Sequence, residues 1–313
     1  MPNGLALSRA LFDSVRPMLT EALPDVMSCS AAGLAGEGSD CLGLDDEISR
    51  DHDWGPAFCL WIPEPIFLQE QSRIECAFAR IPSEFMGFPV RMRPEQRAGR
   101  CGPMAAEAFW RHFLGASSIP RTWREWRSIR EYHLCSCTNG EVFMDASGAF
   151  SAMRAELLKG WPDDVRRKKI AARCMIMAQA GQYNLPRCLQ RGDTCAAMLA
   201  AARFAEAALS MAFLLSRRYM PFYKWASKAA ATLPVLGGDC AALIRRLSRT
   251  DWGNPESGIP AVEAIEAFCG RTADEIRAQG LAAAEGSWLW NLGPEVQMGI
   301  RDPELRRLNV MED

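Results

Sequence analysis

The chain of 313 residues is poor in lysine and histidine, and it lacks long apolar runs and any large excess of charge. Of its 36 Lys and Arg residues only five are lysines, and it has three histidines. No stretch approaches the roughly 18 uncharged apolar residues that a transmembrane helix needs. The net charge of −2 excludes a nucleic-acid coat or a polybasic membrane anchor, since both depend on summed positive charge. We therefore expect a cytoplasmic protein with no membrane partner, in which any anionic ligand is bound by a local site.

Cysteine is plentiful, but the chain has no pair with the CxxC spacing that is typical of metal and redox sites. The 12 cysteines are scattered, which favours reduced thiols that serve as small core residues. Cys135 and Cys137 form a lone CxC. We interpret this spacing as alternate residues of a strand rather than as metal ligands.

Apolar residues make up 49% of the chain, with ten Trp and fourteen Phe, which is enough to bury a core and excludes a disordered protein. Helical and strand patterns alternate up to Gly148, and the remainder is mostly helical. This order predicts an α+β fold, with a small mixed-sheet domain over residues 1–155 and an α-helical bundle domain over 156–313. The expected helices are 5–22, 65–80, 105–114, 121–134, 223–233, 240–247 and 261–279, with two more beginning near Asp163 and Asp193, and the expected strands are 26–32, 54–62, 88–92 and 141–144.

Two neighbouring motifs indicate a metal-binding site. Gly36-Glu37-Gly38-Ser39 is followed after eleven residues by Asp51-His52-Asp53, at the head of an apolar strand. Alternate residues of a strand point to the same side, so Asp51 and Asp53 can present two carboxylates to one spot while His52 faces away. Such a pair suits Mg²⁺, which takes one or two protein carboxylates and fills its other positions with water and phosphate oxygens.

The glycine-rich segment supplies the complementary half of a metal–triphosphate site. Gly38 lets the backbone approach a phosphate closely, and Ser39 adds a hydroxyl beside N–H groups that can form an anion-binding concavity. Asp45, Asp46 and Glu47, which follow in the same loop, are interpreted as solvated surface. The less favoured alternative is an acidic rim that attracts a cationic acceptor.

These motifs resemble the nucleotidyltransferase superfamily that includes DNA polymerase beta and the kanamycin-type antibiotic nucleotidyltransferases. That superfamily shows Gly-Ser, nine to thirteen residues, Asp-x-Asp, and a third carboxylate on a later strand. The resemblance covers residues 1 to about 155 in the order of elements. More narrowly, four segments are similar to a bacterial branch that carries only a domain-of-unknown-function label: Gly38-Ser39, Ser49 to Pro56, Gly140 to Asp145, and Arg218 to Trp225.

The resemblance implies roles for individual residues. Asp51 and Asp53 match the metal-binding pair, and Ser39 matches the phosphate-contacting serine. For the third carboxylate we expect Asp145, with Glu141 as the alternative on the same strand. His52 stands where the superfamily has an apolar residue, and we interpret it as a strand-face residue rather than a catalytic base.

The few lysines limit the choice of a positive partner for a triphosphate. Antibiotic-modifying relatives use a lysine of their helical domain, which implies Lys224; a surface lysine with a buried stem is the equally weighted alternative. Lys168 and Lys169 are interpreted as a solvated helix face. Trp123 and Trp126 are interpreted as one buried helix face rather than a stacking platform for RNA.

The resemblance therefore implies a metal-dependent enzyme. It would use two Mg²⁺ ions to transfer a nucleoside monophosphate from a nucleoside triphosphate, with ATP as the expected donor, to an acceptor hydroxyl on a small molecule. The helical domain would close the active-site cleft. A transferase acting on a protein or a tRNA end, of the toxin–antitoxin type, and a non-catalytic nucleotide-binding module remain as alternatives. The small net charge argues against a nucleic-acid partner.

Overall fold

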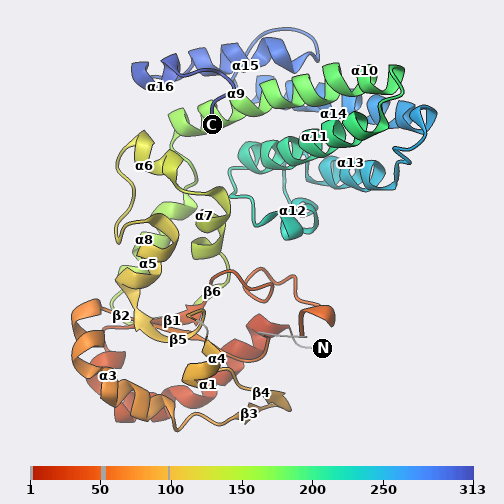
Figure 1. Ribbon diagram of the computed structural model, residues 1–313. Helices are drawn as coiled ribbons and strands as arrows, with labels where there is room; N and C mark the ends of the chain where they lie inside the picture. The colour runs from red at the N-terminus through yellow and green to blue at the C-terminus, as the bar shows by residue number, and fades with distance from the viewer. Residues whose placement is uncertain (1–2, 51–53, 98) are drawn as a thin grey trace. The chain divides into compact units, whose positions relative to one another are not determined.

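The structure is a computed structural model that describes residues 3–50, 54–97 and 99–313 (Figure 1). The chain forms two compact units. The first comprises Met1–Arg121 and Ile129–Lys159, and the second comprises Thr122–Ser128 and Gly160–Asp313. It is a mixed helix-and-sheet protein in which all the strands of the described chain lie in the first unit.

A four-stranded mixed sheet with the order β5-β2-β1-β6 forms the centre of the first unit. β1 pairs antiparallel with both β2 and β6, and β2 pairs parallel with β5. A separate hairpin joins β3 to β4. The strands are β1 (Ala31–Leu34), β2 (Cys59–Ile62), β3 (Glu84–Phe85), β4 (Phe88–Pro89), β5 (Gly102–Ala105) and β6 (Glu141–Asp145).

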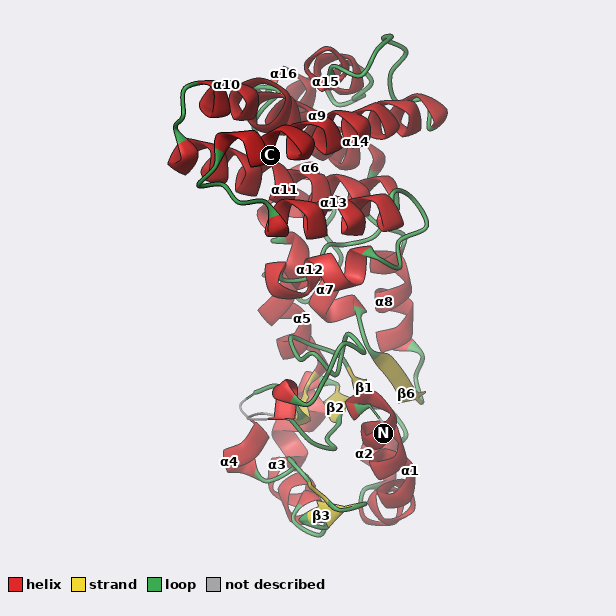
Figure 2. Ribbon diagram, turned by 90° about the vertical axis from the view of Figure 1, so that its right-hand side faces the viewer, coloured by secondary structure: helices red, strands yellow, loops and turns green. Residues whose placement is uncertain are grey.

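Helices cover both faces of this sheet, as Figures 1 and 2 show. Phe58, at the entry to β2, packs against Phe12 of α1 and Phe78 of α3. On the other face the Trp61 ring stacks on Phe150 of α8 with 4.0 Å between the ring centroids. The helices of this unit are α1 (Gly4–Ala22), α2 (Pro24–Met27), α3 (Glu64–Phe78), α4 (Pro94–Arg97), α5 (Ala106–Leu114), α7 (Glu131–Thr138) and α8 (Ala149–Leu158), with a 3₁₀ turn η1 (Ile48–Arg50).

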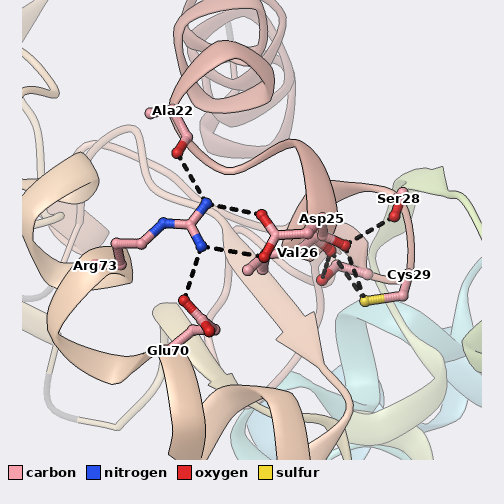
Figure 3. A network of polar contacts seen from close by, with 8 residues as sticks. Ala22, Asp25, Val26, Ser28, Cys29, Glu70 and Arg73 are labelled. Atoms are coloured by element: carbon pink, nitrogen blue, oxygen red, sulfur yellow. Dashed lines mark hydrogen bonds and ion pairs between the residues drawn. The ribbon is translucent and has the colours of Figure 1, made fainter.

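One arginine ties the corner between α1 and α2 to α3 (Figure 3). Arg73 donates to both carboxylate oxygens of Asp25, at 2.7 and 3.1 Å, and to Glu70 at 2.8 Å. It also donates to the carbonyl of Ala22, the last residue of α1. These contacts link α3 to the α1–α2 corner at the protein surface.

The second unit is entirely helical within its described residues. α9 packs between α11 and α15, as Figure 1 shows. Asp193 caps α11 by accepting a hydrogen bond from the Ala196 amide, as its sequence position predicts. The elements are α6 (Trp123–Ser128), α9 (Asp163–Met177), a π-helical turn η2 (Ala178–Asn184), α10 (Leu185–Gln190), α11 (Thr194–Leu215), α12 (Tyr223–Ala230), α13 (Gly237–Arg249), a 3₁₀ turn η3 (Pro255–Gly258), α14 (Ile259–Ala278), α15 (Leu289–Met298) and α16 (Pro303–Arg307).

Lys168 and Lys169 are buried, so their interpretation as a solvated face was wrong. Lys168 donates to Gln297 at 2.9 Å and to the carbonyl of Asn309 at 2.6 Å. Lys169 pairs with Asp313 at 2.9 Å. Burial lowers the pKa of Lys168 to about 8. The chain from Gln297 to Asp313 folds back onto α9 and supplies acceptors for both ammonium groups. The sequence of α9 alone does not predict these contacts.

α11 is the one described helix that is long and apolar enough to span a membrane by length and composition. More than half of its most apolar window, 56%, is buried inside the protein. Core helices of globular proteins have the same composition. Its packing against α9 and α13 accounts for its apolar character without a membrane.

Several expected elements differ from the structure. The strand expected over 26–32 begins only at Ala31, because Pro24–Met27 forms helix α2, and the strand expected over 54–62 begins at Cys59. Cys135 and Cys137 lie in helix α7, not in a strand. Leu134, Cys137 and Thr138 are buried at helical spacing, a pattern that the short CxC alternation obscured. The helix expected over 121–134 is two helices, α6 and the start of α7, which belong to different units. Trp126 is buried as predicted, but Trp123, expected on the same buried face, is only half-buried and lies against the Arg124 and Arg127 guanidinium groups.

Candidate functional site

The glycine-rich turn lies at one end of the central strand. β1 ends at Leu34, and Gly36–Ser39 follows directly. Cys59, the first residue of β2, pairs with Gly33 near that same end. The described chain that enters β2 therefore comes to the end of the sheet where the turn lies. Asp51, His52 and Asp53 lie outside the described residues.

The side chain of Asn139 forms two hydrogen bonds with the backbone of the turn at Gly36. Its side-chain amide donates to the Gly36 carbonyl at 2.7 Å and accepts from the Gly36 amide at 3.0 Å. Gly36 has φ of +146°, which L side chains rarely adopt. Asn139 directly precedes Gly140 at the start of the β6 region, and nothing in the sequence pattern marked it. A residue more than 100 positions away thus fixes the start of the turn.

Asp40 gives a second reason for glycine at position 38. A Cβ atom on Gly38 would lie 2.0 Å from Oδ1 of Asp40. The Asp40 carboxylate therefore folds back over Gly38, and its Oδ1 accepts from the Cys41 amide at 2.9 Å. A side chain at position 38 would force the Asp40 carboxylate to move, so the packing of the turn itself favours glycine there, whether or not a phosphate approaches it.

Two carboxylates of this loop, on the buried Asp40 and the half-buried Asp45, each have one buried oxygen without a hydrogen bond to the described part of the chain. Asp45 Oδ2 accepts from the Gly4 amide at 2.8 Å and from the Trp54 indole at 3.0 Å. Within the described residues, Oδ1 of Asp45 and Oδ2 of Asp40 are buried without a hydrogen bond. Burial raises the pKa of Asp40 although the Arg91 guanidinium lowers it. The interpretation of this acidic run as solvated surface holds for Asp46 and Glu47, which are exposed, but was wrong for Asp45, which is half-buried and accepts from the first residue of α1.

Arg91 joins the glycine-rich turn to the segment that leads into β2. Its Nη2 lies 3.6 Å from Oδ2 of Asp40, and both side chains are largely buried. Its Nε donates to the Gly55 carbonyl at 3.4 Å, and its amide donates to the Pro56 carbonyl at 3.2 Å. Arg91 thus connects the two segments that were expected to form one site, the glycine-rich turn and the entry to β2.

The two candidates for the third carboxylate lie at opposite ends of β6. Glu141 pairs with Leu34, next to the turn, whereas Asp145 pairs with Ala31 at the far end of β1. Asp145 accepts from the Gly148 and Ser151 amides at 2.9 and 2.7 Å and so caps α8. The structure does not bring Asp145 to Ser39. Glu141, the alternative, lies at the end of β6 beside the turn and pairs with Arg9 of α1 at 2.5 Å.

Lys224 lies in the second unit, in the first turn of α12, and is exposed. Its ammonium is 5.3 Å from the centroid of the Trp225 ring, and the Lys228 ammonium is 5.4 Å from the same centroid. The cation–π contact is compatible with a surface lysine. It leaves the ammonium free to move to a ligand.

The described residues by themselves do not provide a metal site, since no group of three or more His, Cys, Asp or Glu among them could hold a metal ion. Beside the turn, one buried oxygen of Asp45 nevertheless has no hydrogen bond within this described set, and Oδ2 of Asp40 has only the Arg91 guanidinium at 3.6 Å. Hard carboxylate donors are what Mg²⁺ prefers. A metal at this end of the sheet would depend on Asp51 and Asp53.

Residues 126–226 match a family described as a domain of unknown function, DUF4037. The match covers less than half of the chain and contains Asn139, both candidates for the third carboxylate, and Lys224. It does not reach the glycine-rich turn. No curated protein and no solved structure matches this chain.

Proposed function

We propose that the protein is a Mg²⁺-dependent nucleotidyltransferase. The observation that carries the proposal is the fixed Gly36–Ser39 turn at the end of a buried central strand. This is the end at which β2 begins, a few residues after Asp53. A backbone turn held from outside by Asn139 offers a preorganised place for phosphate oxygens.

The proposed roles follow from position. Asp51 and Asp53 would hold two Mg²⁺ ions, and Gly38 and Ser39 would contact the phosphates of the bound triphosphate. Bound Mg²⁺ neutralises phosphate charge and the charge that develops on the leaving group. The strand register favours Glu141 over Asp145 as the third carboxylate, because only Glu141 lies beside the turn.

The reaction is an in-line displacement. An acceptor hydroxyl oxygen bonds to the α-phosphorus, the bond from that phosphorus to the bridging oxygen of the β-phosphate breaks, and pyrophosphate leaves with that oxygen. The hydroxyl proton passes to a neighbouring carboxylate or to water. Positioning and charge neutralisation supply most of the catalysis in phosphoryl transfer, so few further groups are required.

The test uses the whole protein with Mg²⁺, a cell extract as the source of acceptors, and ATP labelled in either the α- or the γ-phosphate. Transfer of the α-label without the γ-label supports the proposal. Asp51→Asn and Asp53→Asn should each reduce transfer at least about 100-fold, because each removes a metal ligand. Asp13→Asn, a matched change at an exposed position of α1, should leave transfer unchanged.

Two outcomes would contradict the proposal. Full transfer by either Asp51→Asn or Asp53→Asn would remove the metal pair from the mechanism. Transfer of the γ-label would make the protein a kinase.

A further inference from the structure

The second unit has an aromatic cavity that the proposed transfer reaction does not use. It has a volume of about 380 Å³, within the range of roughly 300–1,000 Å³ that is typical of small-molecule sites. Its walls come from η2 and from the start of α15. The lining residues are Gln179, Tyr183, Asn184, Trp288 and Trp290.

The first wall has an uncommon backbone. η2 is a π-helical turn, a form that is rare and frequent at functional sites. Pro186 follows it, and proline lacks an N–H and clashes with the carbonyl four residues earlier, which opposes a regular α-helix there. With i→i+5 hydrogen bonds, residues four and five apart lie one above the other. Gln179 therefore shares a face with Tyr183 and Asn184.

A buried glutamine joins this wall to the second one. Gln182 donates to the Ser287 carbonyl at 3.1 Å and accepts from the Leu289 amide at 3.1 Å. Its amide nitrogen also donates to Glu266 of α14 at 2.8 Å. Trp288 and Trp290 flank Leu289, so the glutamine fixes the segment that presents both indoles.

The rings and amides of the cavity are available to a ligand. Tyr183 and Trp290 are 45% and 38% exposed, so a ligand can reach part of each ring. The Arg187 guanidinium lies 4.1 Å from the centroid of the Tyr183 ring and orients it. Within the described chain, the side-chain amides of Gln179 and Asn184 have no hydrogen-bond partner, although each can donate and accept.

The lining chemistry selects the class of ligand. None of the lining residues is charged, and the adjacent Arg187 guanidinium is stacked on Tyr183, so the lining fits a neutral ligand better than a phosphate or an ammonium group. Indole and phenol rings pack against flat apolar surfaces and present polar edges. Side-chain amides match hydroxyl groups, which also donate and accept. We infer that the cavity binds a neutral sugar ring, with the aromatic side chains against its C–H face and Gln179 and Asn184 on its hydroxyls.

The test is binding of simple glycosides to the full-length protein. Saturation-transfer NMR would be recorded with the methyl glycosides of glucose, galactose and mannose and with N-acetylglucosamine. Benzoate and benzylamine serve as anionic and cationic probes. At least one sugar should show transfer from protein to its ring protons, and neither charged probe should bind better than that sugar.

Three variants locate the site. Trp290→Ala should weaken sugar binding at least fivefold, and Asn184→Asp, a nearly isosteric change at an exposed position, should weaken it at least threefold. Tyr223→Ala removes an exposed aromatic ring outside the cavity and should have no effect. Asn184→Asp keeps the test valid if Trp290→Ala does not fold.

The inference is overturned if none of the sugars binds, if a charged probe binds more tightly, or if binding is unaffected by Asn184→Asp. It is independent of the proposed transferase activity, because these experiments measure binding without Mg²⁺ or a nucleotide.

Discussion

The two units bury charged groups in different ways. In the first unit, Asp40 and Asp45 are held in a loop, and one oxygen of each is buried without a hydrogen bond. In the second unit, Lys168, Lys169 and Asp313 lie among helices and have direct partners. Burial opposes ionisation of Asp313, but Arg173 and Lys169 outweigh it and lower its pKa to about 2.

This difference distinguishes charged groups that stabilise the fold from charged groups that can bind a ligand. A buried ion with all its partners in place contributes to one specific packing arrangement, and removing it leaves its partners unsatisfied. A buried carboxylate oxygen without a partner costs free energy in the folded state. Such groups concentrate at functional sites, where a ligand supplies the missing contact. The loop of the first unit therefore fits a ligand site better than the buried cluster of the second unit.

The largest expected effect is on the lysine cluster. Lys168→Met should lower the free energy of unfolding by about 2–4 kcal/mol, because the buried Gln297 side chain and the Asn309 carbonyl both lose their donor. Lys159→Met, at a lysine whose side chain is 68% exposed, should change it by less than about 0.5 kcal/mol. Urea denaturation measures both. Equal values would mean that the buried cluster is not structural.

The next effect concerns the glycine-rich turn. Gly38→Ala should lower the free energy of unfolding by about 2 kcal/mol, since the new Cβ would lie 2.0 Å from the Asp40 carboxylate. Gly238→Ala is the matched control, because its Cβ meets nothing within 4 Å and it lies in α13. This control should be neutral or stabilising by up to about 1 kcal/mol.

A double mutant tests the cause. In an Asp40→Ala background, Gly38→Ala should cost much less than it does alone, because the clashing oxygen has been removed. A cost that is the same in both backgrounds would show that Gly38 is required for a reason other than Asp40.

The pH dependence of stability tests the acidic partner of the lysine cluster, Asp313. Asp313 has a folded pKa of about 2, lowered from 3.8, so its stabilisation is fully present above the unfolded pKa. The stabilisation is lost as the pH falls through 3.8 toward 2, and it amounts to about 2 kcal/mol. Urea denaturation at a series of pH values should show this loss in the wild type and a smaller loss in Asp313→Asn. Parallel pH curves for the two proteins would exclude the ion pairs as its source.

Much of the fold could be predicted from periodicity, and the polar interior could not. The Asp193 cap, the helix beginning at Asp163 and strand β6 agree with local sequence signals, because each depends on neighbours in the chain. The partners of Lys168 and of Gly36 lie more than 100 residues away. Such long-range contacts leave no local sequence pattern. Lys168 was therefore predicted to be solvated, and no role was predicted for Asn139.

The candidate site also contains residues that a local motif predicts and residues whose position depends on the tertiary fold. Gly38 and Ser39 were found from their motif, and the structure places them in a turn at the end of a central strand. The choice between Glu141 and Asp145 depended on the pairing of β6 with β1 and on a bulge between Ala32 and Gly33. Strand register is a tertiary property, and both acids satisfy the same sequence pattern.

The smallest expected effect bears on whether the two units act together. If Lys224 contacts a bound triphosphate, Lys224→Ala should weaken binding of a non-hydrolysable ATP analogue with Mg²⁺ by about tenfold, equivalent to about 1.4 kcal/mol. Lys228→Ala is the matched control, because Lys228 lies one turn later on α12 and contacts the same Trp225 ring at a similar distance. Titration calorimetry gives both affinities. A loss confined to Lys224→Ala would assign the helical unit a part in nucleotide binding. Equal affinities for all three proteins would make Lys224 a surface residue and leave the triphosphate to the first unit, where Arg91 already bridges the turn and the entry to β2.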